Sequence, residues 1–246
     1  MPSLFSLNIS AYDTRHGDWP TRREHIRVVI NYADADVVVL QSVAVNPAVD
    51  VLNQAEQLAR LLPDYHFCHY QSANSLPDGR AEGLGILSKV RPADVYVERL
   101  SQRPDHADPK PRMLMHARYE DADRRETFHI INVQLSPVYE QAYDHIRETI
   151  AYADNIAEPR LIVGDFGVPA SSPLLAFLRE AGWQDAWAEL HPNEEGCTYE
   201  AGNLTVRVDM AWTKGDLTVK KIKVISNEVK DSRMSAHLGV YVRWEQ

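Results

Sequence analysis

The residue best placed for chemistry is Asp165, which directly follows the apolar residues 161–163 in the sequence VGDFG. Gly164 and Gly167 on either side of it allow a tight turn after a buried strand. A carboxylate in such a turn binds a metal ion, orients a nucleophile or caps the chain that follows, in this case before Pro169. The sequence around Asp165 leaves these three roles open.

Asp209 and His237 are a second pair of candidates. Asp209 lies inside the apolar segment 206–212, where a buried carboxylate needs a partner that offsets its desolvation. His237 opens the segment 237–244, and a single histidine at a strand end is more often structural than catalytic. If the two side chains meet, the carboxylate would fix one imidazole tautomer and favour the charged imidazole beside a phosphate.

The elements that must position these residues are mostly strands. Short apolar segments rich in Val, Ile, Leu and Phe recur along the whole chain, and their length and β-branched content favour strands over helices. These segments are residues 4–9, 36–40, 85–87, 113–119, 128–133, 160–163, 206–212, 217–225 and 237–244.

Helices are fewer. Amphipathic spacing predicts helices at 21–32 and 48–62, and Ser172 and Gly182 mark the two ends of another. Residues 101–112 hold three prolines among charged side chains, and we expect a surface loop there. Many strands with a few interspersed helices predict an α+β or layered fold.

An internal repeat divides the chain into two halves. Residues 24–34 (EHIRVVINYAD) and 144–154 (DHIRETIAYAD) share seven of eleven positions at an offset of 120 residues. Chance similarity between two amphipathic helices is one explanation, because helix faces draw on few residue types. The other is a pseudo-symmetric domain in which each helix leads into a strand. That symmetry would bring residues 40–42 and 164–167 to one shared cleft.

The composition is that of an ordinary globular protein, with 246 residues, 44% of them hydrophobic, and a formal net charge of −9. The length allows one large domain or two small ones. The acidic balance argues against nucleic-acid binding, because Lys and Arg contact the phosphate backbone. Cys68 and Cys197 are too few for a disulfide scaffold and are expected to be buried thiols. The first residues do not resemble a signal peptide and no apolar segment predicts a membrane span, so we expect a cytoplasmic protein.

Nine short motifs resemble, in the same order, those of one protein superfamily. They are Leu7-Asn8-Ile9, VVVLQS (37–42), GLGILSK (83–89), INVQL (131–135), LIVGDFG (161–167), AGWQDAW (181–187), CTYE (197–200), VRVDMAWT (206–213) and SAHLGV (235–240). In these segments the chain is similar to the endonuclease/exonuclease/phosphatase superfamily. The resemblance implies a DNase I-like fold, an α/β (α+β) four-layer sandwich of two packed β-sheets flanked by helices, with internal pseudo-two-fold symmetry. It also implies one domain over residues 1–246.

The departures from the family pattern concern the active site. Members of the superfamily cleave phosphoesters with Mg²⁺, and the resemblance places the two main carboxylate ligands at positions that are Ser42 and Ala236 in this chain. Gln134 stands where the family has a histidine, and Gly167 where it has an asparagine. The chain retains four residues of the family's active-site pattern: Asn8, Asp165, Asp209 and His237. Mg²⁺ requires hard oxygen ligands. Because both carboxylate positions are replaced, no metal cofactor is expected.

Two functions remain open. The first is an inactive or strongly impaired pseudoenzyme that binds a small phosphorylated ligand or a protein partner. In it His237, Asp209 and Asp165 are surviving catalytic positions, and Asn8 and Gln134 are ligand-binding residues. The second is an active or weakly active phosphohydrolase that binds Mg²⁺ through relocated ligands, for which Glu82 and Asp13 are weak candidates. Deliberate inactivation of an enzyme would leave the same pattern as natural loss.

The sequence offers no clear replacement for the charge of the lost metal. Lys89 and Arg207 lie beside the motifs, but active relatives carry basic residues at the same positions. Four tryptophans have apolar neighbours and are expected in the core rather than as stacking platforms for bases, whereas Trp19 is expected to be freer. A nucleic-acid partner is therefore not expected.

Overall fold

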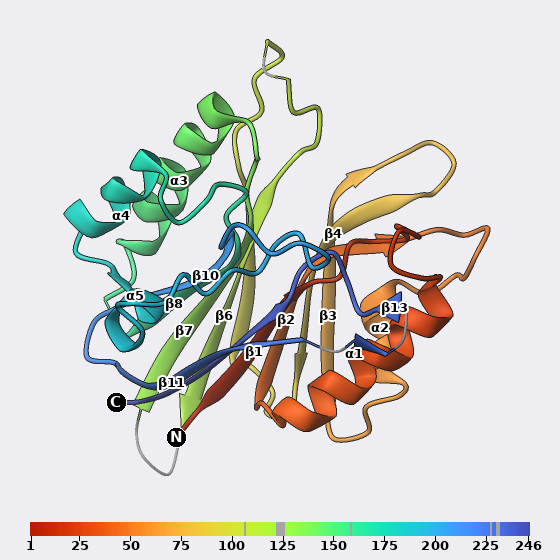
Figure 1. Cartoon of the computed structure of the whole chain (residues 1–246), viewed down its shortest axis with the longest axis horizontal. Helices are drawn as coiled ribbons and strands as arrows, with labels where there is room; N and C mark the ends of the chain where they lie inside the picture. Colours follow the sequence, from red (N-terminus) through yellow and green to blue (C-terminus); the bar gives the residue numbers. More distant parts are fainter. Residues whose placement is uncertain (106, 122–125, 158, 227, 230–231) are drawn as a thin grey trace.

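The structure, a computed structural model, describes residues 1–246 except 106, 122–125, 158, 227 and 230–231. Figure 1 shows the arrangement of its elements. In chain order these are β1 (Ser3–Asn8), α1 (Trp19–Ala33), β2 (Val37–Val45), α2 (Gln54–Ala59), β3 (Phe67–Ser75), β4 (Ala81–Ser88), β5 (Asp94–Arg99), β6 (Met113–Asp121), β7 (Glu126–Gln134), α3 (Tyr139–Ala153), β8 (Arg160–Asp165), a 3₁₀ turn (Pro173–Leu175), α4 (Ala176–Glu180), β9 (Gln184–Asp185), α5 (Ala186–Leu190), β10 (Asp209–Lys214), β11 (Thr218–Ile225), β12 (Glu228–Val229), β13 (Ser232–Arg233) and β14 (Gly239–Glu245).

Two six-stranded sheets form the centre of the molecule. Their strand orders are β11-β14-β1-β2-β4-β3 and β5-β6-β7-β8-β10-β9. In each sheet the two middle strands are parallel, β1 with β2 and β7 with β8, and their neighbours pair antiparallel. A helix joins each parallel pair, α1 in the first sheet and α3 in the second. The two sheets therefore share one topology.

The alternation of side chains along the strands produces four layers. In β1, Leu4 packs between the sheets, whereas Phe5 and Leu7 belong to the core beneath α1 and α2. In β8, Val163 packs between the sheets and Ile162 belongs to the core beneath α3. Both faces of both sheets are thus buried, and helices cover the two outer faces (Figure 1). The four-layer DNase I-like sandwich predicted from the sequence is confirmed.

The repeat noted in the sequence maps onto equivalent helices. Residues 24–34 lie mostly in α1 and residues 144–154 mostly in α3, each the crossover between the parallel strands of its sheet. Ile26 and Ile146 occupy the same position in the two copies, and both are buried against their own sheet. The shared topology explains the repeat better than chance similarity does.

Several elements differ from the sequence prediction. Strands β3 and β5 were not predicted, because their sequences are polar and most of their side chains are at least partly exposed. The short elements β9, α5, β12 and β13 were not predicted either. The helix predicted at 48–62 is limited to α2, because Asn53 and Glu56 form a capping box that begins the helix at Gln54.

Three smaller predictions are also corrected. Cys68 and Cys197 are half-buried rather than buried. Trp19 is buried, with its indole N–H donating to Oε1 of Gln57 at 2.7 Å. The described residues of 101–112 form a loop, as predicted, but Asp108 and Arg112 within it are buried as an ion pair.

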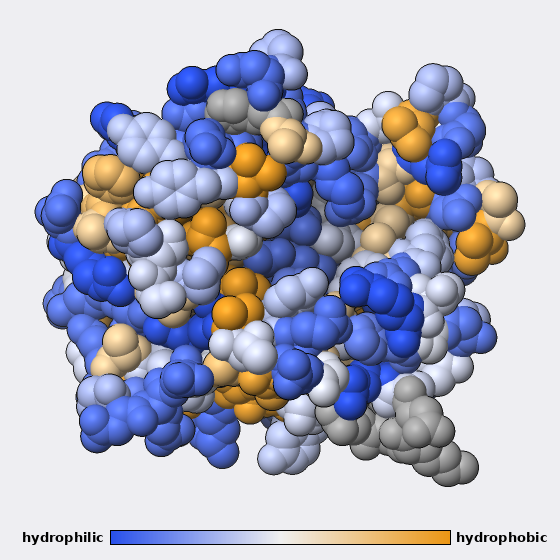
Figure 2. Space-filling view, turned by 45° about the horizontal axis from the view of Figure 1, so that its top comes forward, coloured by the Kyte–Doolittle hydropathy of each residue, from blue (hydrophilic) through white to orange (hydrophobic). Residues whose placement is uncertain are grey.

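The face shown in Figure 2 is mainly hydrophilic, with hydrophobic side chains in small separate groups. This distribution is ordinary for a folded domain and does not mark that face as a large apolar interface. Among the described residues, no helix is both long and apolar enough to cross a membrane.

Candidate functional site

The candidate site lies where the apolar layer between the two sheets gives way to polar side chains. Gln41 at the end of the apolar part of β2 donates to Oγ of Ser6 at 3.1 Å and to Oδ1 of Asn132 at 2.7 Å. Asn132 in turn donates to the Leu40 carbonyl at 3.1 Å. These buried amides connect the two sheets through hydrogen bonds, while Oε1 of Gln41 has no partner among the described residues.

Asp165 ends β8 and is held by two donors. Its Oδ2 accepts from Nδ2 of Asn8 at 2.8 Å, and its Oδ1 accepts from the Gly167 N–H at 2.9 Å. The second bond caps the turn after the strand, which was one of the roles predicted for this residue. The bond to Asn8 joins the ends of β1 and β8, which belong to different sheets.

Two glycines make this turn possible. Gly164 has φ +137, and a Cβ there would lie 2.1 Å from the Val133 carbonyl oxygen. Gly167 has φ +67, and its Cβ would lie 2.5 Å from the Ser136 carbonyl oxygen. A side chain at either position would displace the backbone that presents Asp165.

His237 and Asp209 form the predicted pair. Nδ1 of His237 lies 2.9 Å from Oδ2 of Asp209, and both side chains are buried. Burial alone would lower the pKa of His237, but the Asp209 carboxylate and its hydrogen bond raise that pKa to about 9. The imidazole is therefore positively charged at neutral pH, with Nδ1–H directed to the carboxylate. The ring of Tyr199 packs against it, with centroids 4.7 Å apart.

Asp209 is buried beside another acid. It pairs in register with Asp165 across β10 and β8, so two carboxylates are neighbours in a water-poor environment. Burial raises the pKa of Asp209 and the charge of Asp165 raises it further, whereas His237 and the Thr198 hydroxyl lower it. The cation of His237 is thus the main stabilising charge for this carboxylate.

Ser42 and Gln134 form a closed pair across the two sheets. Nε2 of Gln134 donates to the Ser42 hydroxyl at 2.7 Å, and Oε1 of Gln134 accepts from the Ser42 N–H at 3.0 Å. A register shift in β2 between Leu40 and Val43, with φ +52 at Ser42, gives Ser42 this orientation. A neutral serine–glutamine pair therefore occupies the position where the resemblance places a carboxylate and a histidine.

Ala236 contributes only a buried methyl group. Its N–H donates to the Ser10 hydroxyl at 3.3 Å, and its carbonyl accepts from the Ala201 N–H at 2.8 Å. The methyl side chain of Ala236 has no oxygen that could bind a cation. The assignment of Ala236 as a lost ligand position stays a prediction from the sequence.

A cleft of about 270 Å³ opens above these residues. The cleft is lined by Asn8, Ser10, Ala11, Asp13, Arg15, Ser42, Glu82, Lys110, Tyr199, Ala236 and His237. The carboxylates are Asp13 and Glu82, which pair with Arg15 at 2.6 Å and with Lys110 at 3.1 Å respectively. The cleft thus combines two ion pairs with the charged imidazole of His237.

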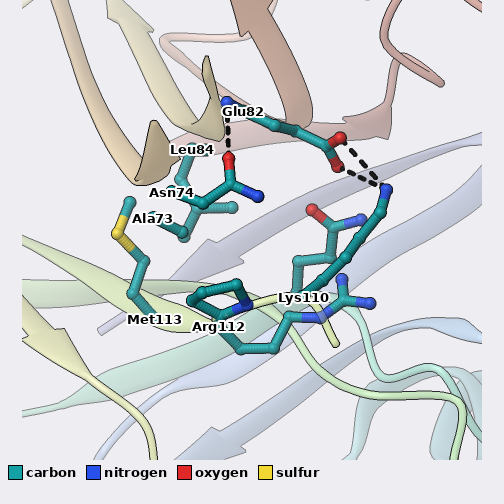
Figure 3. Close-up of a pocket in the computed structure, with 10 residues that line it drawn as sticks. Ala73, Asn74, Glu82, Leu84, Lys110, Arg112 and Met113 are labelled. Carbon is teal, nitrogen blue, oxygen red and sulfur yellow. Dashed lines mark hydrogen bonds and ion pairs between the residues drawn. The ribbon is translucent and has the colours of Figure 1, made fainter. Parts of the chain in front are cut away.

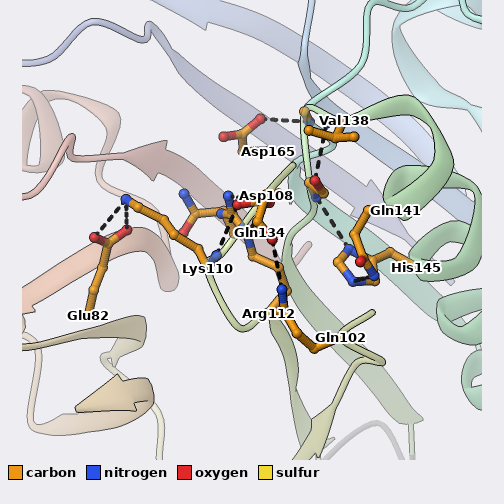
Figure 4. A network of polar contacts seen from close by, with 12 residues as sticks. Glu82, Gln102, Asp108, Lys110, Arg112, Gln134, Val138, Gln141, His145 and Asp165 are labelled. Carbon is orange, nitrogen blue, oxygen red and sulfur yellow. Dashed lines mark hydrogen bonds and ion pairs between the residues drawn. The ribbon is translucent and has the colours of Figure 1, made fainter. Parts of the chain in front are cut away.

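The sequence did not predict Lys110 or Arg15 in this cleft. Lys110 comes from the proline-rich loop between β5 and β6, and Figure 4 shows its side chain extending toward Glu82 on β4. Arg15 comes from the segment after β1 and reaches Glu200 as well as Asp13. Both residues lie in irregular segments, whose course depends on tertiary contacts that no local pattern encodes.

The chain belongs to the endonuclease/exonuclease/phosphatase family, whose model matches residues 5–237. Solved structures support this fold. An endonuclease/exonuclease/phosphatase from Beutenbergia cavernae is 18% identical with a TM-score of 0.82, covering 99% of this chain and 71% of that chain. A mannosyl-6-phosphatase from Bacteroides thetaiotaomicron is 16% identical with a TM-score of 0.78, and both chains are covered completely.

A third similar structure is the human Nocturnin catalytic domain with bound sulfate anion. It is 15% identical with a TM-score of 0.75, and the match covers 99% of this chain and 93% of that chain. No curated protein matches this chain by sequence. At these identities the structural neighbours define the fold of the chain and not its reaction.

The family is typically metal-dependent, so the donors in the cleft must be compared with the needs of Mg²⁺. Among the residues that the structure describes, Asp165, Asp209 and His237 form a group whose ligand atoms lie within 4.8 Å of one another. Oδ2 of Asp165 accepts from Asn8, however, and Asp209 is paired with His237. Mg²⁺ takes oxygen ligands in near-ideal octahedral geometry, and an imidazole nitrogen is not one of them. This donor set does not fit Mg²⁺.

Proposed function

We propose that this chain is a pseudoenzyme of its family, which binds a phosphorylated ligand but hydrolyses it very poorly or not at all. The observation that carries the proposal is the Ser42–Gln134 pair, in which hydroxyl, amide and backbone N–H satisfy one another. A hydroxyl engaged in this way offers no charge to a metal. With Ala236 as the other replaced position, two of the expected carboxylates are absent.

The size of the kinetic loss follows from the role of the metal. A bound cation neutralises charge on the transferring phosphoryl group, which is worth several kcal/mol in the transition state. Because each ~1.4 kcal/mol is a factor of ten in rate, a deficit of several decades is expected. The retained His237–Asp209 pair orients and charges an imidazole but does not restore this stabilisation.

The retained half of the site suits anion binding. Asn8 is oriented by its bond to Asp165, and the imidazolium of His237 lines the same cleft. Side chains that are fixed before binding lose little entropy when a phosphate arrives. We therefore propose a small phosphorylated molecule as ligand. Two features argue against a polyanionic nucleic acid: the net charge of −9, and the carboxylates Asp13 and Glu82 in the cleft.

The same proposal includes a single domain over residues 1–246 and a cytoplasmic location. A protein partner that covers the cleft is the other form that a binding role would take. Co-purification of the full chain with a phosphorylated small molecule, identified by mass spectrometry of the heat-released fraction, would favour the first form. Phosphate-independent capture of one protein partner, lost in a His237→Ala variant, would favour the second.

A second function, an active or weakly active phosphohydrolase, is favoured by the intact His237–Asp209 pair. Turnover of p-nitrophenyl phosphate and bis(p-nitrophenyl) phosphate with Mg²⁺ or Mn²⁺ distinguishes the two. The pseudoenzyme predicts rates equal in the wild type and in His237→Ala, at the level of buffer. Metal-dependent turnover that His237→Ala abolishes would establish the hydrolase instead.

A further inference from the structure

Lys110 lies on a loop whose geometry is fixed by buried contacts. Its N–H donates to Oδ1 of Asp108 at 3.1 Å, and Oδ2 of Asp108 pairs with Arg112 at 3.1 Å in the interior. Pro109 and Pro111 flank it and restrict the backbone on both sides. The Cα of Lys110 is therefore well positioned, although its side chain is 52% exposed.

The ammonium group of Lys110 reaches the cleft beside the neutral Ser42–Gln134 pair. It donates to both carboxylate oxygens of Glu82, at 3.1 and 3.3 Å. Figure 3 shows this contact between the β4 residue and the loop. Lys110 lines the cleft together with Ser42 and His237, and it lines a small adjoining cavity together with Gln134. A positive charge is thus present in the part of the cleft that lacks the metal carboxylates.

Each cation of the cleft has an acidic partner. Arg15 pairs with both Asp13 and Glu200, whereas Lys110 pairs with Glu82. His237, which lines the same cleft, is paired with Asp209. A phosphate dianion that displaces Glu82 from Lys110 would receive charge-assisted hydrogen bonds from lysine and imidazole, which are stronger than neutral ones.

We infer that the ammonium of Lys110 is the cationic anchor of this cleft, which holds the terminal phosphate of a small phosphomonoester without a divalent ion while Glu82 acts as the displaceable counter-ion. This inference rests on the proposed function, because it assumes that a phosphorylated ligand binds. Lysine is a regular phosphate ligand in proteins, where it acts as a compact point charge.

The remainder of the ligand has an adjoining space. A second cavity of about 310 Å³ shares Ala11, Glu82 and Lys110 with the cleft. Its other lining residues are both apolar and polar: Tyr12, Ala44, Val45, Leu76 and Ala81, with Asn46, Asn74 and Arg80. A phosphate on Lys110 would place its ester substituent at the entrance of this second cavity. The anchor therefore lies between a phosphate subsite and a subsite lined by both apolar and polar side chains.

The test is a calorimetric titration of the full chain with methyl phosphate at pH 7.5, in EDTA and in Mg²⁺. Wild type is expected to bind equally in both buffers. Lys110→Met is expected to bind about tenfold more weakly, and Lys110→Arg close to wild type, because a charge-assisted contact is lost only in the first. Glu82→Gln is expected to bind about threefold more tightly, because the competing carboxylate is gone. Lys220→Met is the matched control, since Lys220 pairs with Glu245 outside the cleft.

The outcomes separate this inference from the proposed function. Binding by the wild type that Lys110→Met leaves unchanged overturns the anchor but not the ligand-binding role. Binding that requires Mg²⁺ and is lost in Glu82→Gln also overturns the anchor, because Glu82 would then be a metal ligand. Absence of binding by the wild type in either buffer overturns both. Dimethyl phosphate, with a single charge, is expected to bind more weakly than methyl phosphate, and equal affinity would contradict a site for a dianion.

Discussion

Gln134 and Ser42 bind each other through two hydrogen bonds of 2.7 and 3.0 Å that join the two sheets at the base of the cleft. Each sheet contributes one partner, because Gln134 ends β7 and Ser42 lies in the bulged part of β2. The pair occupies the position where the sequence resemblance places a carboxylate and a histidine. It has consequences for stability as well as for chemistry.

The first prediction concerns that pair. Gln134→Ala leaves the buried N–H and hydroxyl of Ser42 without these partners, which is expected to lower the free energy of unfolding by about 1–3 kcal/mol. Urea denaturation followed by tryptophan fluorescence measures the change. Gln71→Ala is the control, because Gln71 makes a single long bond of 3.5 Å to the Ser72 carbonyl. An equal effect of the two substitutions would mean that the pair contributes nothing specific.

The second prediction concerns the turn that presents Asp165. Gly164→Ala places a methyl group against the Val133 carbonyl and is expected to destabilise the fold by at least about 3 kcal/mol. Gly182→Ala shares a positive φ, but the nearest atom to its Cβ is 3.8 Å away on Lys214, so only about 1 kcal/mol is expected. Thermal melts of both variants provide the comparison. Similar melting temperatures would show that the close approach at Gly164 relaxes without cost.

The third prediction is a pH dependence from His237, whose pKa is raised from 6.5 to about 9. The folded chain holds this proton more tightly than the unfolded chain, so the stabilisation is complete below pH 6.5 and is lost as the pH rises toward 9. The stability difference between wild type and His237→Gln is therefore expected to shrink between those values. In an Asp209→Asn background this stability difference is expected to stay constant over the same pH range. A difference that still shrinks there would contradict the pairing of His237 with Asp209.

The fourth prediction has the opposite sign and concerns His116 on β6. Burial, followed by the charge of His129, lowers the pKa of His116 to about 4. The unfolded chain binds this proton first, so stability is present above pH 6.5 and falls on acidification toward pH 4, by up to about 3 kcal/mol. His116→Gln keeps hydrogen-bonding capacity toward Tyr152. It is expected to lose less stability than the wild type between pH 6.5 and pH 4. Parallel curves of stability against pH for the wild type and His116→Gln would contradict a contribution of His116 to the acid sensitivity.

The sheets were largely predictable from the sequence, for a physical reason. Strands such as β1, β2 and β8 are buried on both faces, and continuous apolar segments of that length are a strong local signal. Strands β3 and β5 lie at sheet edges and carry polar residues, so no such signal distinguishes them from loops.

The site was predictable only in part. Asp165 ends β8, Asp209 begins β10 and His237 lies just before β14, and these strands determine where the three side chains meet. The contact of Asn8 with Asp165, and of Ser42 with Gln134, joins residues at least 92 positions apart and follows from the packing of the two sheets. Lys110 depends on the course of a loop that Asp108 and Arg112 hold in place, so its arrival in the cleft could not be predicted.

A calorimetric titration of Mg²⁺ into the wild type and into a Ser42→Glu/Gln134→His/Ala236→Asp variant tests the loss of the metal site most directly. We expect no heat of Mg²⁺ binding at millimolar concentrations for the wild type. We expect saturable binding for the variant, because two carboxylates return and the amide that engages position 42 is removed. Tight Mg²⁺ binding by the wild type would contradict the loss of the metal site.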